Sequence, residues 1–183
     1  MSNDIKYRLA NAMKECLVSS SVEKVTVKEI VDTCGVTRQT FYRNFQDKYD
    51  LINWYFDKIL VESFRQMGEG ETVYESLVNK FEYIQMEMLF FRAAFKNDEQ
   101  NNLKEHDFKL IREFYIDQIE SRSHRKISEK ILFQLEIYCQ GSVFMTVQWV
   151  LGYRQFTPQE LARLLADSMP GELERVFREV KLV

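Results

Sequence analysis

Residues 26–43 contain two short helix signals separated by one glycine. Thr26 and Glu29 have capping-box spacing, in which the threonine hydroxyl accepts a bond from an amide three residues on and the glutamate reaches back. Gly35 can adopt the left-handed conformation that a tight turn needs, and Thr37 can cap a second helix directly after it. The pattern predicts two helices, over residues 26–34 and 37–43, joined by a turn.

The rest of the chain is also expected to be helical. Its 183 residues include only 6 Gly and 2 Pro, too few for a turn-dense β fold. Apolar residues recur at helical spacing in further segments, which are 4–18, 47–67, 72–88, 100–121, 128–152, 158–169 and 172–182. We therefore expect an all-α protein, with a three-helix domain over residues 1–47 and a helical bundle over residues 48–183.

Charge and cysteine content exclude several classes of protein. Residues 1–50 carry 8 basic and 7 acidic side chains, and the rest of the chain 17 and 21, so any nucleic-acid contact must come from a local patch. The net charge of −3 argues against a histone-like or membrane-surface protein. The three cysteines (Cys16, Cys34 and Cys139) have no metal-binding or disulfide spacing, which predicts a cytoplasmic protein without a metal site.

The outward face of the segment 37–43 has the chemistry of a DNA-reading helix. Ile30, Val36, Phe41 and Phe45 are expected to hold the two short helices together. The polar positions left over suit base edges, since Arg pairs with guanine, Gln or Asn with adenine, and Thr meets the thymine methyl. No acidic residue interrupts this face. The predicted base-reading residues are Thr37, Arg38, Gln39, Thr40, Arg43 and Asn44.

Lys48 stands in the first turn of the next predicted helix. A cation is unfavourable there against the helix dipole, but becomes useful when a phosphate docks at the same helix end. We therefore expect Lys48 to contact the DNA backbone. The alternative for the whole motif is a structural helical hairpin, or a protein-interaction module without DNA binding.

The run TVKEIVDTCGVTRQTFYRNFQDKYDL, residues 26–51, resembles the DNA-binding domain of the TetR family of bacterial regulators. The marks are the apolar–small–Gly–Val turn, the Phe41–Tyr42 pair, Phe45, Lys48 and Leu51, with Cys34 where the family usually has alanine. The resemblance implies a regulator, expected to be a repressor, that binds an operator in double-stranded DNA. It also implies that Lys28, Thr40, Tyr42 and Lys48 lie at the DNA, with Tyr42 and Lys48 on phosphates.

The segment 72–169 more loosely resembles the C-terminal domain of regulators of dihydroxyacetone kinase operons, in the runs EYIQMEMLFFRAAFKND and QWVLGYRQFTPQELARLL. This implies a homodimer formed through the last helices, and an effector that is either a small molecule or a partner protein. The uncharged run from residue 137 to 153 supports an interface because a small domain cannot cover it on all sides. The predicted interface residues are Leu161, Leu164, Leu165, Val176 and Phe177.

An effector pocket is one reading of the aromatic residues in the second domain, and ordinary core packing is the other. The predicted pocket residues are Tyr55, Phe64, Tyr83, Met86, Phe144 and Trp149. The sequence contains no GxSxG, GxGxxG or HExxH motif, and His106 and His124 lie in polar surroundings, so an enzyme with a catalytic site or cofactor is not expected. The segment 137–153 is also short for a membrane span.

Overall fold

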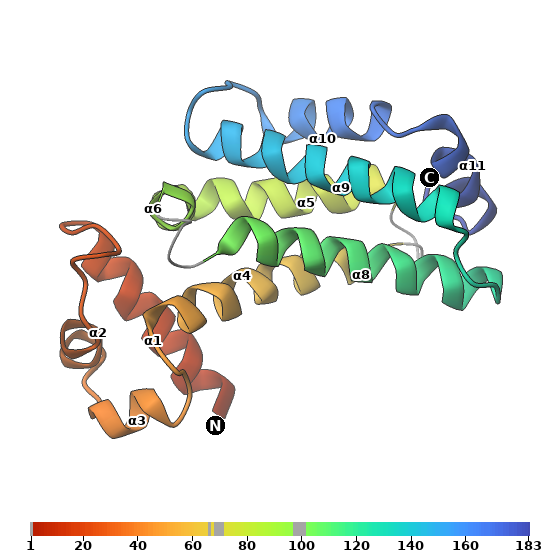
Figure 1. The fold of residues 1–183 in the computed structure, drawn as a ribbon. Coiled ribbons are helices and arrows are strands. Elements are labelled where there is room, and N and C mark those ends of the chain that lie inside the picture. The colour runs from red at the N-terminus through yellow and green to blue at the C-terminus, as the bar shows by residue number, and fades with distance from the viewer. Residues whose placement is uncertain (1, 66, 68–71, 97–101) are drawn as a thin grey trace. The chain divides into compact units, whose positions relative to one another are not determined.

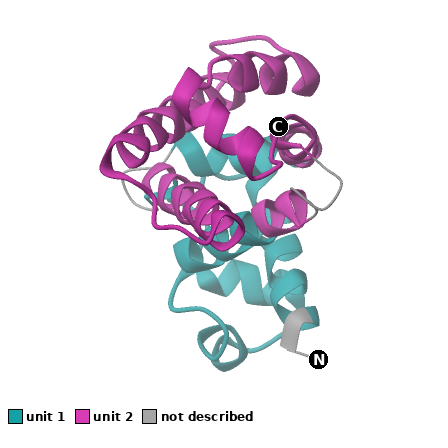
Figure 2. Cartoon of the chain, turned by 90° about the vertical axis from the view of Figure 1, so that its right-hand side faces the viewer, with its two compact units in different colours: residues 1–58, 87–103 teal, residues 59–86, 104–183 magenta. Residues whose placement is uncertain are grey.

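The computed structural model describes residues 2–65, 67, 72–96 and 102–183, and the elements within these ranges are helices, so the all-α prediction is confirmed (Figure 1). The helices form two compact units. One contains residues 1–58 and 87–103, and the other contains residues 59–86 and 104–183 (Figure 2). The first unit is therefore built from two separate stretches of the chain.

Three helices at the start of the chain form the N-terminal part of the first unit. They are α1 (Ser2–Leu17), α2 (Val27–Cys34) and α3 (Arg38–Tyr42). α1 packs against α2, and α2 packs against α3. Leu9, Met13, Ile30 and Phe41 are fully buried where these helices meet, which follows the periodicity of the sequence.

Helix α6 (Met88–Lys96) completes this unit. Phe56, on α4 (Lys48–Phe64), packs its ring edge-on against Phe91 and Phe95 of α6, with ring centroids 5.7 and 6.2 Å apart. Phe90 is buried with them. The chain thus returns to the first unit after residue 86, because packing there removes the apolar surface of these aromatic side chains from water.

Glu87 stands between α5 (Val73–Met86) and α6, and its part-buried carboxylate forms hydrogen bonds within the first unit. Its carboxylate accepts bonds from the Lys14 ammonium at 2.8 Å and from the Tyr55 hydroxyl at 3.0 Å. Lys14 also donates to the Tyr55 oxygen at 3.2 Å. Three segments of the chain, α1, α4 and the start of α6, are joined by this one set of bonds.

The second unit is a bundle of α5, α8 (Leu103–Ser123), α9 (Glu129–Val150), α10 (Pro158–Asp167) and α11 (Gly171–Glu179), together with the end of α4. The long helices α5, α8 and α9 lie side by side, with Phe81 of α5 against Trp149 of α9 at 5.6 Å and Arg112 of α8 bonded to Glu136 of α9 at 2.8 Å. α10 packs on α5, and α11 packs on α9.

Two expected boundaries differ from the structure. The units divide within α4, after residue 58, rather than between residues 47 and 48 as expected, because the first half of α4 packs into the first core. The helix expected over residues 72–88 ends at Met86, and α6 follows as a separate helix. The expected breaks at residues 68–70 and 97–98 lie outside the described residues.

Candidate nucleic-acid interface

Helix α2 begins and ends at the residues that the sequence indicates. The Glu29 amide donates to the Thr26 hydroxyl at 3.2 Å, and the Thr26 amide donates to the Glu29 carboxylate at 2.7 Å, which completes the capping box. These bonds lower the pKa of Glu29. The helix stops at Gly35, whose φ of 68° lies in the left-handed region, so the turn to α3 is set by a residue without a side chain.

Helix α3 is short and is fixed from both sides. Its N-cap, Thr37, accepts a bond from the Thr40 amide at 3.2 Å. Phe41 is fully buried and packs against Phe45 at 5.8 Å. Because one aromatic anchor and one cap define a five-residue helix, the remaining side chains of α3 have a determined direction.

Six of the predicted DNA-binding residues are exposed on this motif, and five of them keep their polar groups free of the hydrogen bonds described below. Arg38, Gln39 and Arg43 stand on or directly after α3, Tyr42 is 58% exposed, and Lys28 is exposed on α2. These side chains can offer guanidinium and amide groups to base edges, and ammonium and phenol groups to phosphates. Of the five side chains named here, three are cationic, and all five are free of the protein core.

Three other predicted residues already use their polar groups inside the protein. The Thr37 and Thr40 hydroxyls lie 3.0 Å apart and share a hydrogen bond. The Asn44 side-chain amide donates to the Thr40 carbonyl at 2.8 Å and closes the end of α3. Asn44 is thus a helix-ending residue in the structure, and the two threonine hydroxyls are engaged with each other.

Lys48 differs most from its expected role. Its ammonium donates to the carbonyl oxygens of Val22, Glu23 and Val25, at 2.6, 2.9 and 2.8 Å. An ammonium has three donors, so these bonds use all of them. Sequence periodicity could not show this, because the three carbonyls lie more than twenty positions away from Lys48 along the chain.

The start of α4 is also capped from within the chain. The Asp47 carboxylate accepts bonds from the amides of Tyr49 and Asp50, both at 2.8 Å. A phosphate at this helix end would meet the negative charge of Asp47 in place of free amides. The phosphate contact expected at Lys48 stays a prediction, and in the structure the ammonium and the amides that would form the site are bonded within the chain.

Arg8 is a residue of this motif that sequence reasoning missed. Its guanidinium donates to the Cys34 carbonyl at 3.1 Å, next to the turn at Gly35. The bond satisfies a carbonyl that the end of α2 leaves open. The helical spacing of α1 indicates only that Arg8 is a surface residue, so the pattern gave no signal for this contact.

The six predicted effector-pocket residues do not gather around one cavity. Phe64 and Trp149 are buried in the second unit, whereas Tyr83, Met86 and Phe144 are 37, 71 and 61% exposed. Tyr55 belongs to the first unit, where it bonds Lys14 and Glu87. The physical reason is helix phase: Met86 and Phe144 fall on the outer sides of α5 and α9.

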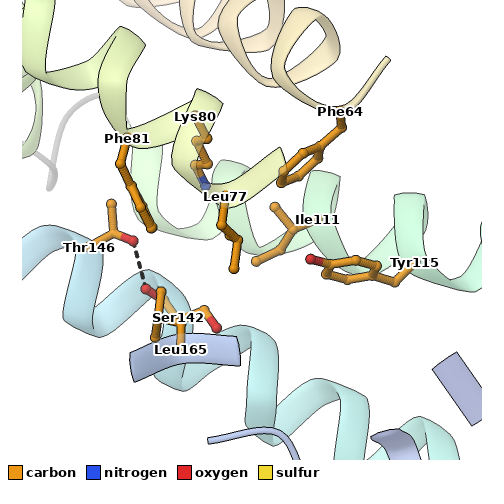
Figure 3. A pocket seen from close by; sticks show the side chains of 9 residues that line it. All are labelled: Phe64, Leu77, Lys80, Phe81, Ile111, Tyr115, Ser142, Thr146 and Leu165. Carbon is orange, nitrogen blue, oxygen red and sulfur yellow. Dashed lines mark hydrogen bonds between the residues drawn. The ribbon is translucent and has the colours of Figure 1, made fainter. Parts of the chain in front are cut away.

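A small cavity lies in the second unit among side chains from five helices (Figure 3). It has about 10 Å³ of free volume, which is room for one water molecule. Of the predicted pocket residues, only Phe64 lines it. The lining residues are Phe64, Leu77, Lys80, Phe81, Ile111, Tyr115, Ser142, Thr146 and Leu165.

The polar side of this cavity includes a buried ion pair that sequence reasoning missed. The Lys80 ammonium lies 3.0 Å from an Asp107 carboxylate oxygen, and the two side chains are 4 and 0% exposed. A signal was present, because Asp107 stands four residues from both Leu103 and Ile111 and so lies on the apolar face of α8. A charged residue at such a position requires a buried partner.

The predicted dimer-interface residues divide into two groups. Leu161, Leu165 and Phe177 are buried within their own chain, so they belong to the core of the second unit. Leu164 is 48% exposed, and Val176 is half-buried. The larger exposed apolar surface lies on α9, where Phe133, Ile137 and Phe144 are 64, 56 and 61% exposed.

The described ranges hold a deeply buried thiol at Cys139 and no cluster of metal ligands. Burial raises the pKa of Cys139 to about 12, which keeps this thiol protonated. Over residues 2–65, 67, 72–96 and 102–183, no group of three His, Cys, Asp or Glu side chains is placed to hold a metal ion. None of the helices described there is both long and apolar enough to cross a membrane.

Known proteins match both units of the chain. Residues 11–54 match the family model described as bacterial regulatory proteins of the tetR family, and residues 71–171 match a model described as a transcriptional regulator C-terminal region. The HTH-type dhaKLM operon transcriptional activator DhaS of Lactococcus lactis subsp. lactis (strain IL1403) is 25% identical over 111 residues, which are 61% of this chain and 58% of that protein.

A solved structure, described as the dihydroxyacetone kinase operon activator DhaS, has the same fold, with a TM-score of 0.67 and 17% identity over 93% of this chain and 97% of that chain. The C-terminal match alone spans more than half of the chain. With a helix-turn-helix whose turn lies at Gly35 and a helical second unit, this chain belongs to the TetR family of bacterial transcriptional regulators.

Proposed function

We propose that this regulator binds a near-palindromic operator as a homodimer, with α3 in the major groove. The observation that carries the proposal is the exposed set Arg38, Gln39 and Arg43 on a helix that Phe41 fixes to the core. Arg pairs with the two acceptors of guanine and Gln with the edge of adenine, which makes these residues base readers. Thr37 and Thr40 are proposed to meet thymine methyl groups through their own methyl groups.

Lys28 and Tyr42 are the proposed phosphate contacts. Both side chains are exposed, Lys28 on α2 and Tyr42 on α3, and neither takes part in the hydrogen bonds of the motif described above. Phosphate contacts fix the orientation of a protein on the duplex without reading sequence. Lys28 and Tyr42 are therefore proposed to set the register of the protein on the DNA, and Arg38, Gln39 and Arg43 to read the base sequence.

The partner surface for dimerisation is the exposed apolar face of α9. Phe133, Ile137 and Phe144 follow one another at helical spacing, and Gly141 between them has open space above its Cα, so a second helix can approach closely. Ile137, Gly141 and Phe144 belong to the uncharged stretch that begins at residue 137, which a hydrophobic interface favours. Leu164 and Val176 remain proposed members of the interface, whereas Leu161, Leu165 and Phe177 support it from the core.

The effector is proposed to act through the second unit and through α4, which belongs to both units along the chain. The cavity of about 10 Å³ is far smaller than a small-molecule site, which has roughly 300–1,000 Å³. A small-molecule effector would therefore have to open this cavity, whereas a partner protein would bind the surface. A thermal-shift assay with candidate small molecules separates a small-molecule effector from a partner protein. Only a small-molecule effector raises the Tm of this protein without a second protein present.

The sign of regulation is open to a direct measurement. The TetR resemblance predicts a repressor, whereas both DhaS relatives are named activators. An operon for phosphorylation of dihydroxyacetone is the first proposed target. A reporter driven by the upstream region of that operon rises with this protein if it activates and falls if it represses.

Selection from a library of random duplexes tests the DNA-binding function. The expected product is an inverted repeat whose half-sites lie about 10–10.5 base pairs apart, or a multiple of that, because two α3 helices of a symmetric dimer meet successive major grooves. Arg38→Ala serves as the control protein and should return a degenerate half-site. If the wild-type protein selects no sequence and shows no salt-dependent affinity for DNA, it is a protein-interaction module instead.

A further inference from the structure

Lys48 holds together the non-helical connection between α1 and α2. The side chains of Val22 and Val25 in this connection are buried, at 0 and 1% exposure. Their burial places the backbone of residues 22–25 close to the start of α4. The amides of Lys24 and Val25 both bond the Ser21 carbonyl, and the carbonyls of Val22, Glu23 and Val25 converge on the Lys48 ammonium instead.

The match between donors and acceptors is complete. Three part-buried or exposed carbonyls need donors, and an ammonium supplies three that can spread over them. Bonds from a charged donor are shorter and stronger than neutral ones, which agrees with distances of 2.6–2.9 Å. A planar guanidinium would not converge on three carbonyls in this way.

The charges around Lys48 favour this internal role. Burial lowers the pKa of Lys48, and the nearby carboxylates of Glu23, Asp47 and Glu29 act in the opposite direction. The ammonium is therefore surrounded by three acidic groups and three carbonyl oxygens. A DNA phosphate approaching the same point would meet this negative surrounding and would find no free N–H on Lys48.

We propose that Lys48 is a positioning residue for DNA binding, which fixes where α2 begins and so where Lys28 and α3 are presented, and that it does not contact a phosphate. Val25 is followed directly by Thr26, the cap of α2, so a displacement of the connection shifts the whole motif. The proposal rests on the proposed DNA-binding function, but the ammonium bonds can be tested without DNA.

The first experiment compares Lys48→Met with Lys28→Met by fluorescence anisotropy on a 20-base-pair duplex of random sequence over a range of salt concentrations. Lys48→Met should lower Tm by roughly 4–8 °C and weaken binding, while the slope of log affinity against log salt stays at the wild-type value. Lys28→Met, the matched control, removes one phosphate contact from each subunit of the dimer, so it should lower that slope by about 1.8 and leave Tm unchanged. A slope that falls by about 1.8 in Lys48→Met overturns the proposal.

The second measurement uses the wild-type protein without DNA, and it decides the matter if Lys48→Met does not fold. Hydrogen-bonded ammonium protons exchange slowly with water, so the ¹⁵N resonance of the Lys48 ammonium, assigned through its own side-chain carbons, should be observable. Buried Lys80 serves as the positive reference and exposed Lys28 as the negative one. A Lys48 resonance as fast-exchanging as that of Lys28 overturns the proposal, even when DNA binding itself is intact.

Discussion

The Lys80 ammonium lies 3.0 Å from the Asp107 carboxylate, and water reaches almost none of either side chain. Removing one partner of such a pair leaves an uncompensated charge in the core. Lys80→Met is therefore expected to lower the free energy of unfolding by about 3–5 kcal/mol, as measured by denaturant titration.

The double variant Lys80→Met/Asp107→Leu separates this cost from the value of the pair itself. It should recover most of the loss, because two apolar side chains no longer require charge compensation. Lys109→Met is the matched control. Lys109 pairs with Glu105 on the surface of α8, the helix that carries Asp107, and its loss should change stability by less than about 1 kcal/mol. Equal losses in Lys80→Met and Lys109→Met would contradict the prediction.

Arg38 and Gln39 are expected to determine sequence preference. Arg38→Ala or Gln39→Ala should cost about 1–3 kcal/mol on the selected operator and much less on a duplex of random sequence. Titrations of each variant against both duplexes measure the ratio. If the two duplexes lose affinity equally, these side chains contact phosphates and do not read bases.

The α9 face is expected to hold the dimer together. A charge introduced as Phe144→Glu should be buried without a partner in the interface, and so should weaken association by at least about 2 kcal/mol, or roughly thirtyfold. Sedimentation velocity over a concentration series measures the shift. Val61→Glu is the control, because Val61 is similarly exposed on α4, at 62% against 61% for Phe144. Dimers that persist in Phe144→Glu would place the interface elsewhere.

Acid should weaken the helix starts that capping boxes hold. Bonds from the backbone and the threonine hydroxyl lower the pKa of Glu29, Glu75 and Glu160. The unfolded chain then binds protons more readily than the folded one, so this stabilisation is present above the unfolded value of about 4.5 and is lost as pH falls through the lowered folded values.

Tm measured between pH 7 and pH 3 should therefore fall with acidification. In Glu29→Gln/Glu75→Gln/Glu160→Gln, where the caps carry no titrating group, the fall should be smaller. An identical pH profile for the triple variant and the wild type would show that other carboxylates control acid stability.

Local patterns in the sequence predicted what local physics determines. The capping residues Thr26 and Thr37, the turn at Gly35 and the burial of Phe41 all depend on neighbours within a few positions, and the structure has them as expected. The exposed α3 side chains followed from the same helix phase. Periodicity was therefore sufficient for the fold class and for most of the proposed reading surface.

Contacts between distant segments could not be predicted in this way. The bond from Asn44 to Thr40 is local, but Lys48 meets carbonyls of the α1–α2 connection, and Glu87 meets Lys14 across 73 positions. The effector-pocket prediction misplaced Met86 and Phe144 because aromatic and Met content does not fix which side of a helix faces the core. Where polar groups find their partners depends on the packed structure.

The return of the chain through α6 limits how the proposed DNA-binding part, residues 1–58, can be transferred to another protein. Residues 1–58 contain only part of their core, because Phe90, Phe91 and Phe95 complete it only after the whole of α5 has been made. On the ribosome, the first half of the protein must wait for residue 95 to emerge before Phe56 is covered. A cassette cut at residue 58 and fused to a foreign regulatory domain would therefore expose an aromatic surface and be prone to aggregate, whereas a cassette that carries residues 87–96 along would not.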